Sequence, residues 1–143
     1  SFPTRRSSDL LSKFNNVKFI LISPEELGLP SYVKNEINSE SIVMETTNLE
    51  ENINKLDVLY MTRVQKERFF NEHDYIRLKN TYILTQDKLK SAKDDLTILH
   101  PLPRVGEIDS EVDIDERACY FKQVKFGLYA RMAIIMDLLE VGK

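Results

Sequence analysis

The sequence of 143 residues contains a single cysteine, Cys119, so the chain cannot form a disulfide within itself. Because paired cysteines are typical of oxidising compartments, one lone thiol favours the reducing cytoplasm. The two histidines, His73 and His100, lie far apart in the sequence and offer little for a soft-metal site. We therefore expect a cytoplasmic protein with no bound metal.

Long apolar runs, a large excess of one charge and glycine-rich loops are missing as well. No run approaches the roughly 20 apolar residues that a membrane helix needs. The net charge of −3 provides no electrostatic reason to expect nucleic acid or an anionic membrane as a partner. The few glycines form neither a phosphate-binding loop nor a dinucleotide-binding signature. With 42% hydrophobic and 30% charged residues, the composition is that of an ordinary globular domain.

Short apolar runs alternate with helix signals along the chain. The runs predict five strands, at residues 17–22, 41–45, 57–61, 81–85 and 96–99. Helices are predicted from Ser31 to about Ile37, starting near Thr47, from Thr85 to Ala92, and from Tyr120 to Leu139. The acidic segment 106–116 is expected to be an irregular, mobile loop. This order predicts a three-layer, Rossmann-like α/β domain with a mostly parallel sheet, closed by a long C-terminal helix.

Polar residues follow the third predicted strand, where ligands bind in open α/β sheets. Arg63 offers a planar fork of donors that matches a carboxylate or phosphate. Gln65 can add an amide contact, and Glu67 lies four residues from Arg63 and can orient it. The pattern suits a small dianionic ligand, although a solvated charged loop explains it equally well.

A second unusual segment, "HPLPRV" at residues 100–105, follows the fifth predicted strand. Its two prolines stiffen the backbone and remove two donors, so the carbonyls of Pro101 and Leu102 become candidate acceptors for a ligand. Taken alone, a rigid turn is the simpler interpretation. A histidine such as His100 is also more often structural than a general base.

Together, "YMTRVQKER" at residues 60–68 and "LHPLPRV" at residues 99–105 resemble the aspartate carbamoyltransferase catalytic chain. The likeness continues through "SAKDDLTILHPLPRVGEIDSEVD" into "YFKQVKFGLYARMAIIMDLL" and covers about residues 11–139. It implies that the chain is the aspartate-binding half of such a protein. The carbamoyl-phosphate-binding half, with its Ser-Thr-Arg-Thr signature, would precede it.

The resemblance assigns roles to residues of this chain. It implies that Arg63 and Gln65 bind aspartate, with Arg63 on a substrate carboxylate and Glu67 orienting it. It implies that Leu102 and Pro103 contact carbamoyl phosphate and the attacking amine through their backbone, across a cis bond. No catalytic residue is assigned to this half. Supporting positions are Thr62, Glu67, His100 and Arg104.

The reaction that the resemblance implies needs no cofactor and no covalent enzyme intermediate. The amine of L-aspartate attacks carbamoyl phosphate, giving N-carbamoyl-L-aspartate and phosphate, a step of pyrimidine synthesis. The complete chains would form a homotrimer with shared active sites, with or without a regulatory chain. The present chain is expected to be inactive alone, because half of each site and a neighbouring subunit's lysine are missing.

Two other interpretations remain. Ornithine carbamoyltransferase carries an acidic pocket and a His-Cys-Leu-Pro loop, whereas this chain has Pro101 and offers Arg63. The other alternative is a non-catalytic amino-acid-binding or scaffold domain derived from the enzyme. A nucleotide-binding Rossmann-like module is less favoured than either, because the chain lacks the glycine signature of such a module.

Two features depart from the family pattern. The first ten residues, "SFPTRRSSDL", look like translated sequencing-adapter sequence, so we interpret residues 1–10 as non-native-looking and residues 11–143 as the domain. Phe126 stands where the family commonly has asparagine before a glycine, and we expect it to alter the packing of the last helix.

Overall fold

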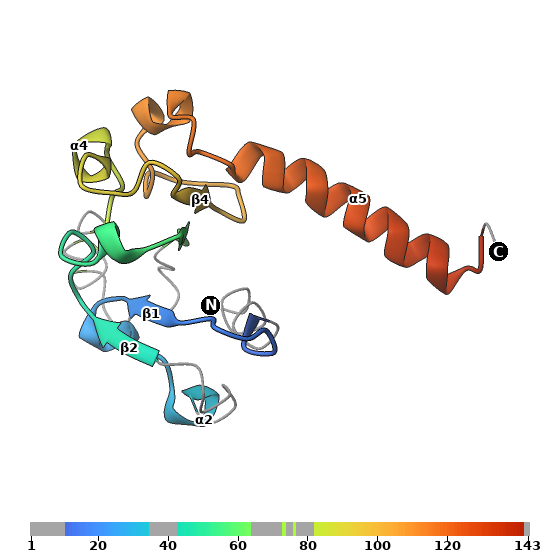
Figure 1. The fold of residues 1–143 in the computed structure, drawn as a ribbon, viewed down its shortest axis with the longest axis horizontal. Coiled ribbons are helices and arrows are strands. Elements are labelled where there is room, and N and C mark those ends of the chain that lie inside the picture. The colour runs from blue at the N-terminus through green and yellow to red at the C-terminus, as the bar shows by residue number, and fades with distance from the viewer. Residues whose placement is uncertain (1–10, 35–42, 64–72, 74–75, 77–81, 142–143) are drawn as a thin grey trace. The chain divides into compact units, whose positions relative to one another are not determined.

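The computed structural model describes residues 11–34, 43–63, 73, 76 and 82–141, and these are shown in colour in Figure 1. The chain divides into two compact units, Ser1–Asn52 and Ile53–Lys143. Each unit contains its own pair of parallel strands. Parallel pairing was the central prediction for the fold, and it is confirmed in both units.

The first unit is built on the strands β1 (Phe19–Ile22) and β2 (Val43–Thr46). They pair in parallel from Phe19 opposite Val43 to Ile22 opposite Thr46. A 3-10 turn, η1 (Glu25–Leu27), and the short helix α2 (Ser31–Lys34) lie between them in sequence. Pro24 directly precedes η1, as expected for a residue that cannot continue the ladder of strand hydrogen bonds.

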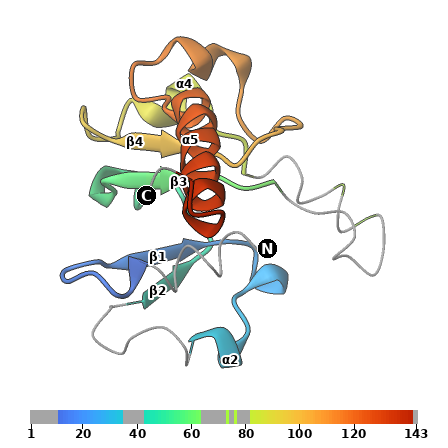
Figure 2. The same ribbon diagram turned by 90° about the vertical axis from the view of Figure 1, so that its right-hand side faces the viewer.

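The second unit is built on β3 (Val58–Tyr60) and β4 (Thr97–Leu99), which lie side by side in parallel in Figure 2. A 3-10 turn, η2 (Ile53–Lys55), precedes β3, and the helix α4 (Gln86–Leu89) precedes β4. Thr85 caps α4 as predicted, because its hydroxyl accepts from the backbone N–H of Lys88 at 3.4 Å. After β4 come the 3-10 turn η4 (Ser110–Ile114) and the long helix α5 (Tyr120–Leu138).

The core of the second unit lies around the central residue of β4. Ile98 is completely buried and pairs with Leu59 of β3. On its other side it forms an isolated bridge to Ala118, just before α5 begins. The described side chains that are at most 1% exposed come from η2, α4, β4, η4 and α5 and from the residues that connect these elements: Ile53, Leu84, Leu89, Leu96, Ile98, His100, Val112 and Tyr120.

Two of the sequence predictions fail in this unit. Leu84 forms only a single bridge, to Ile108, instead of belonging to a strand at residues 81–85, of which residue 81 is not described. Correspondingly, the acidic segment 106–116 is not irregular, since it contains η4 and buries Ile108 and Val112. The reason is that these two apolar side chains, which stand between acidic residues in the sequence, pack in the core.

The helix predictions are confirmed in part. The helix from Thr85 ends at Leu89, and the residues after Thr47 form turns and η2 instead of an α-helix. Residues 35–37 of the predicted second helix lie outside the described residues. The long C-terminal helix is confirmed to within one residue, and it extends away from β4 in Figure 1.

The apolar side chains along α5 are largely exposed. Tyr120 is the one buried residue of this helix, whereas Phe126 is 64% exposed and Leu138 is 76% exposed. Apart from Tyr120, this helix therefore buries no side chain in the part of the chain that the structure describes. None of the described helices is long and apolar enough to span a membrane.

We predict that Ile98→Ala lowers the free energy of unfolding by about 2–5 kcal/mol, because it empties a fully buried position between two pairing partners. Urea unfolding of the 143-residue chain measures this value. Ile114→Ala removes the same atoms from a side chain that is 88% exposed, and it should change stability by less than about 0.5 kcal/mol. Equal effects of the two substitutions would contradict the assigned core.

Candidate functional site

The two segments singled out in the sequence begin side by side at the carboxyl ends of β3 and β4. The last contact of the ladder is the backbone N–H of Met61, which donates to the carbonyl of Leu99 at 2.8 Å. Immediately after it come Thr62, which is half-buried, and Arg63, which is exposed. Gln65 and Glu67 lie outside the described residues. Parallel pairing thus brings the start of the Arg63 segment to the start of the His100 segment, at the sheet edge where such folds bind ligands.

His100 is buried, at 1% exposure, and both of its ring nitrogens have partners. The backbone N–H of Leu102 donates to Nδ1 at 2.9 Å, and Nε2 lies 2.7 Å from Oε1 of Glu107. The backbone N–H of His100 donates to Oε1 of Gln123 at 2.9 Å. The ring therefore has no nitrogen left for a substrate, which fits a structural role better than that of a general base.

The peptide bond between Leu102 and Pro103 is cis, as the resemblance implied. Leu102 also has a positive φ of 46°, a conformation that residues other than glycine rarely adopt. Its side chain is half-buried, and Pro103 is exposed. The backbone of this pair thus forms a bent, partly accessible surface directly after β4.

Arg104 points its guanidinium into the protein instead of leaving it free for a ligand. Its two terminal nitrogens donate to the two carboxylate oxygens of Asp113, each at 2.5 Å. The hydroxyl of Tyr120 donates to the same carboxylate, and the guanidinium lies 5.8 Å from the centre of the Tyr120 ring. The arginine thereby ties the loop after β4 to η4 and to the first residue of α5.

This cluster shifts the proton affinities of its members. Hydrogen bonds from Arg104, and secondly from Tyr120, hold the pKa of Asp113 below its ordinary value of 3.8. Burial, followed by the hydrogen bond to Asp113, raises the pKa of Tyr120 to about 12. The pKa of Arg104 is raised by its hydrogen bonds to Asp113, so the ion pair persists across the physiological range.

Four residues that support this edge were not identified from the sequence: Glu107, Asp113, Tyr120 and Gln123. Glu107 and Asp113 belong to the segment that was expected to be mobile, where acids usually face solvent. Gln123 is one of several polar residues along α5, and nothing in the sequence separates it from the others, yet its side chain accepts from the backbone of His100 and lies 3.4 Å from the hydroxyl of Tyr60. A buried acid three residues after an arginine has no sequence signature of its own, so only the fold reveals these partners.

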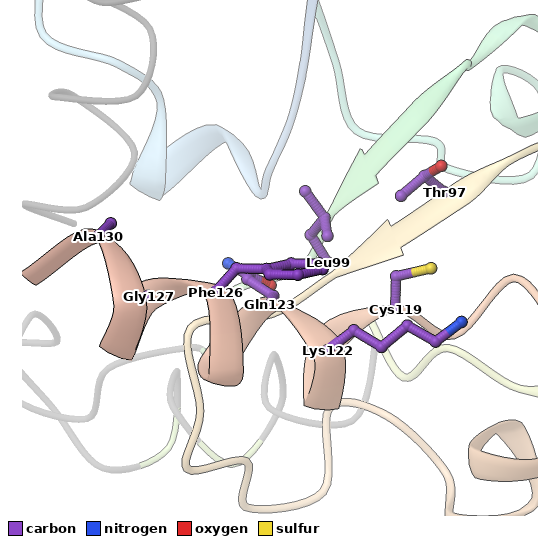
Figure 3. Close-up of a pocket in the computed structure, with 8 residues that line it drawn as sticks. All are labelled: Thr97, Leu99, Cys119, Lys122, Gln123, Phe126, Gly127 and Ala130. Atoms are coloured by element: carbon purple, nitrogen blue, oxygen red, sulfur yellow. The ribbon is translucent and has the colours of Figure 1, made fainter. Parts of the chain in front are cut away.

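A groove of about 520 Å³ lies between β4 and α5 (Figure 3). Leu99 and Phe126 line it, together with the half-buried Cys119. Such mainly apolar walls do not provide the fork of donors that a dianionic ligand needs. No group of three or more metal-ligating side chains occurs in the part of the chain that the structure describes.

Comparison with known families identifies the class of this chain. Residues 5–138 match the family described as aspartate/ornithine carbamoyltransferase, Asp/Orn binding domain. The chain therefore belongs to this family, and it consists of an α/β domain with parallel strands and a long C-terminal helix. The match begins at residue 5, within the first ten residues that we interpret as non-native-looking.

Individual relatives narrow the class to the aspartate enzymes. The chain is 57% identical over 132 residues to an aspartate carbamoyltransferase catalytic subunit of Clostridium kluyveri, with 92% of the chain and 43% of the relative covered. It is 60% identical over 132 residues to the catalytic subunit of Finegoldia magna, with the same coverage. The chain thus spans less than half the length of the curated relatives it matches.

Solved structures agree with the sequence relatives. The catalytic subunit of M. jannaschii aspartate transcarbamoylase superposes with a TM-score of 0.86 at 37% identity, covering 96% of this chain and 46% of that one. An aspartate transcarbamoylase of Trypanosoma cruzi in complex with N-(phosphonacetyl)-L-aspartic acid superposes with a TM-score of 0.81 at 34% identity, covering 92% and 44%. The fold and the resemblance to aspartate carbamoyltransferase are therefore confirmed.

We predict that Asp113→Asn destabilises the chain by about 1–3 kcal/mol at neutral pH, because Arg104 and Tyr120 lose a charged acceptor. The folded pKa of Asp113 is lower than the unfolded one, so its contribution is present above the unfolded value and is lost as the pH falls through the folded value. Unfolding free energies of the two proteins should therefore converge as the pH falls below 3.8.

Asp87→Asn is the control for this titration. Asp87 pairs with Lys90 at 2.7 Å, but its side chain is 84% exposed, so its removal should leave stability nearly unchanged at every pH. A gap between wild type and Asp113→Asn that stays constant into strong acid would show that the carboxylate charge does not provide the stabilisation.

Proposed function

We propose that this chain is the aspartate-binding half of an aspartate carbamoyltransferase catalytic chain. In the complete protein it would take L-aspartate and carbamoyl phosphate and release N-carbamoyl-L-aspartate and phosphate. The observation that carries the proposal is the parallel pairing of β3 and β4, which starts the Arg63 segment and the Leu102–Pro103 segment at neighbouring positions. The identity of the two substrates is inferred from the family to which the chain belongs.

In the proposed site, Arg63 and Gln65 bind the aspartate. The exposed guanidinium of Arg63 carries a planar set of donors that pairs with a carboxylate in two places and repels the ammonium of an ornithine side chain. Glu67 orients Arg63, and Thr62 supports the segment where it leaves β3. Leu102 and Pro103 contact carbamoyl phosphate and the attacking amine through their backbone.

The proposed chemistry is one of positioning. The aspartate nitrogen forms a bond to the carbamoyl carbon, the bond from that carbon to the phosphate oxygen breaks, and the nitrogen gives up a proton that the departing phosphate accepts. Holding both substrates at one sheet edge converts a two-body encounter into a reaction within one complex. Buried support from His100 and Arg104 keeps the edge in place without contributing a nucleophile.

The remaining parts of the proposal concern the whole protein. A homotrimer of complete catalytic chains, with or without a regulatory chain, provides the residues that this half lacks. The placement is cytoplasmic, in keeping with a single half-buried thiol at Cys119. No cofactor takes part in the proposed reaction.

The test is a hybrid chain in which residues 11–139 follow the first half of the C. kluyveri relative. We expect the hybrid to form carbamoyl aspartate with L-aspartate and to be inactive with L-ornithine. Arg63→Ala should raise the KM for aspartate roughly 10- to 100-fold, the effect of losing about 1.5–3 kcal/mol of charged hydrogen bonds. A colorimetric assay of the ureido product measures both quantities.

The matched control is Lys90→Ala, which removes a cation that is 76% exposed and should leave the KM for aspartate unchanged. The 143-residue chain alone should produce no carbamoyl aspartate. Turnover of ornithine by the hybrid, or an unchanged KM in Arg63→Ala, would count against the proposed function.

A further inference from the structure

His100 and Glu107 form a buried hydrogen-bonded pair that encloses the segment between them. Their exposures are 1% and 7%, and His100 Nε2 lies 2.7 Å from Glu107 Oε1. Buried polar groups are expensive unless every donor and acceptor is used. The remaining polar atoms of this buried pair therefore require partners of their own.

Each remaining atom of the pair binds the backbone of the loop. The N–H of Leu102 donates to Nδ1 of His100 at 2.9 Å, and the N–H of Val105 donates to Oε2 of Glu107 at 2.9 Å. Because Nδ1 is an acceptor, the ring proton resides on Nε2, which donates to Glu107. One unbroken series of hydrogen bonds thus runs from Leu102 through the two side chains to Val105.

This network holds most of the backbone donors that the loop possesses. Residues 101–105 include two prolines, which have no N–H, so three backbone donors remain. Two of the three, those of Leu102 and Val105, are bound by His100 and Glu107. The first of these N–H groups precedes the Leu102–Pro103 peptide bond in the sequence, and the second follows it.

The loop also needs to be held, because its conformation is strained. The φ of 46° at Leu102 places a branched side chain in the left-handed region. Such a conformation is strained and persists only where the surroundings enforce it. The N–H of this same residue is the one bound by His100, and the N–H of His100 is bound in turn by Gln123 of α5.

We propose that His100 and Glu107 are positioning residues that lock the Leu102–Pro103 backbone into its reactive geometry. Neither side chain offers an atom to the substrate, since both ring nitrogens and both carboxylate oxygens are already engaged. Their effect on the reaction is exerted through the loop. The inference rests on the proposed function, in which that loop contacts carbamoyl phosphate and the attacking amine.

The test uses the hybrid chain with Glu107→Gln, His100→Asn and the double variant. Glutamine keeps the shape of Glu107 but has one acceptor oxygen, so one of the two donors loses its partner. Asparagine can still accept from the N–H of Leu102 but does not reach Glu107. We expect each single variant to lower kcat at least 10-fold with little change in the KM for aspartate, the opposite of Arg63→Ala.

The double variant tests whether the two side chains act as one unit. If they do, the kcat of the double variant should be close to that of the single variant with the lower kcat. The two losses of kcat should not multiply. Independent, multiplying losses would overturn the proposal.

Asp115→Asn is the structural control. Asp115 and Arg117 form an ion pair at 2.8 Å with side chains that are 10% and 18% exposed, on the segment that bridges to β4. Asp115→Asn removes the negative charge of this ion pair. It should lower the thermal midpoint of unfolding as the Glu107 change does, yet leave kcat within twofold. Equal losses of kcat in Asp115→Asn and Glu107→Gln would reduce His100 and Glu107 to a general stabilising role and overturn the proposal.

A spectroscopic measurement separates this inference from the proposed function and needs no substitution of His100 or Glu107. The chain has two histidines, so ¹⁵N-histidine labelling gives two sets of ring signals, and His73→Gln assigns them. We expect His100 as a fixed tautomer with its proton on Nε2. A proton on Nδ1, or rapid exchange between tautomers, would overturn the clamp even in an active hybrid, whereas an inactive hybrid with the expected tautomer would overturn only the proposed function.

Discussion

Parallel hydrogen bonding between β3 and β4 is the constraint on which the candidate site depends. The two strands are short, but their register, with Leu59 opposite Ile98, buries the centre of β4 completely. Because parallel strands end at the same edge, the chain segments that leave them have to start next to each other. Two loops 37 residues apart in sequence, counted from Arg63 to His100, thereby become neighbours at their roots.

Two hydrogen-bonded networks, one buried and one half-buried, then hold the second loop. His100 and Glu107 bind the backbone on either side of Leu102–Pro103, while Arg104 turns away to Asp113 and Tyr120. The two arginines of this region differ in their surroundings. The charge of Arg104 is paired with Asp113, whereas Arg63 is exposed after β3 and is the residue that we propose to bind the anionic substrate. A reaction that proceeds by positioning requires such a rigid loop more than it requires a reactive side chain.

The described part of the chain leaves apolar surface exposed, and the chain matches only part of its relatives. It spans 43% of the length of the C. kluyveri relative. Along α5 the side chains of Phe126, Met132 and Leu138 are at least half exposed, and an apolar groove runs beside the helix. Phe126, which we expected to alter the packing of the last helix, is 64% exposed and lines that groove in Figure 3.

The sequence by itself determined the fold class, the parallel strand pairs, the long helix from Tyr120 and the two segments that form the candidate site. These features follow from local periodicity, capping and short motifs, which a single stretch of chain contains. Only the tertiary structure decided that Leu84 forms one bridge instead of belonging to a strand, that the acidic segment 106–116 is packed, and that Arg104 faces inward. It alone identified Glu107 and Gln123 as partners of His100. The physical reason is that an acid or an amide reveals its role only through the donors it meets, and those donors come from residues up to 23 positions away.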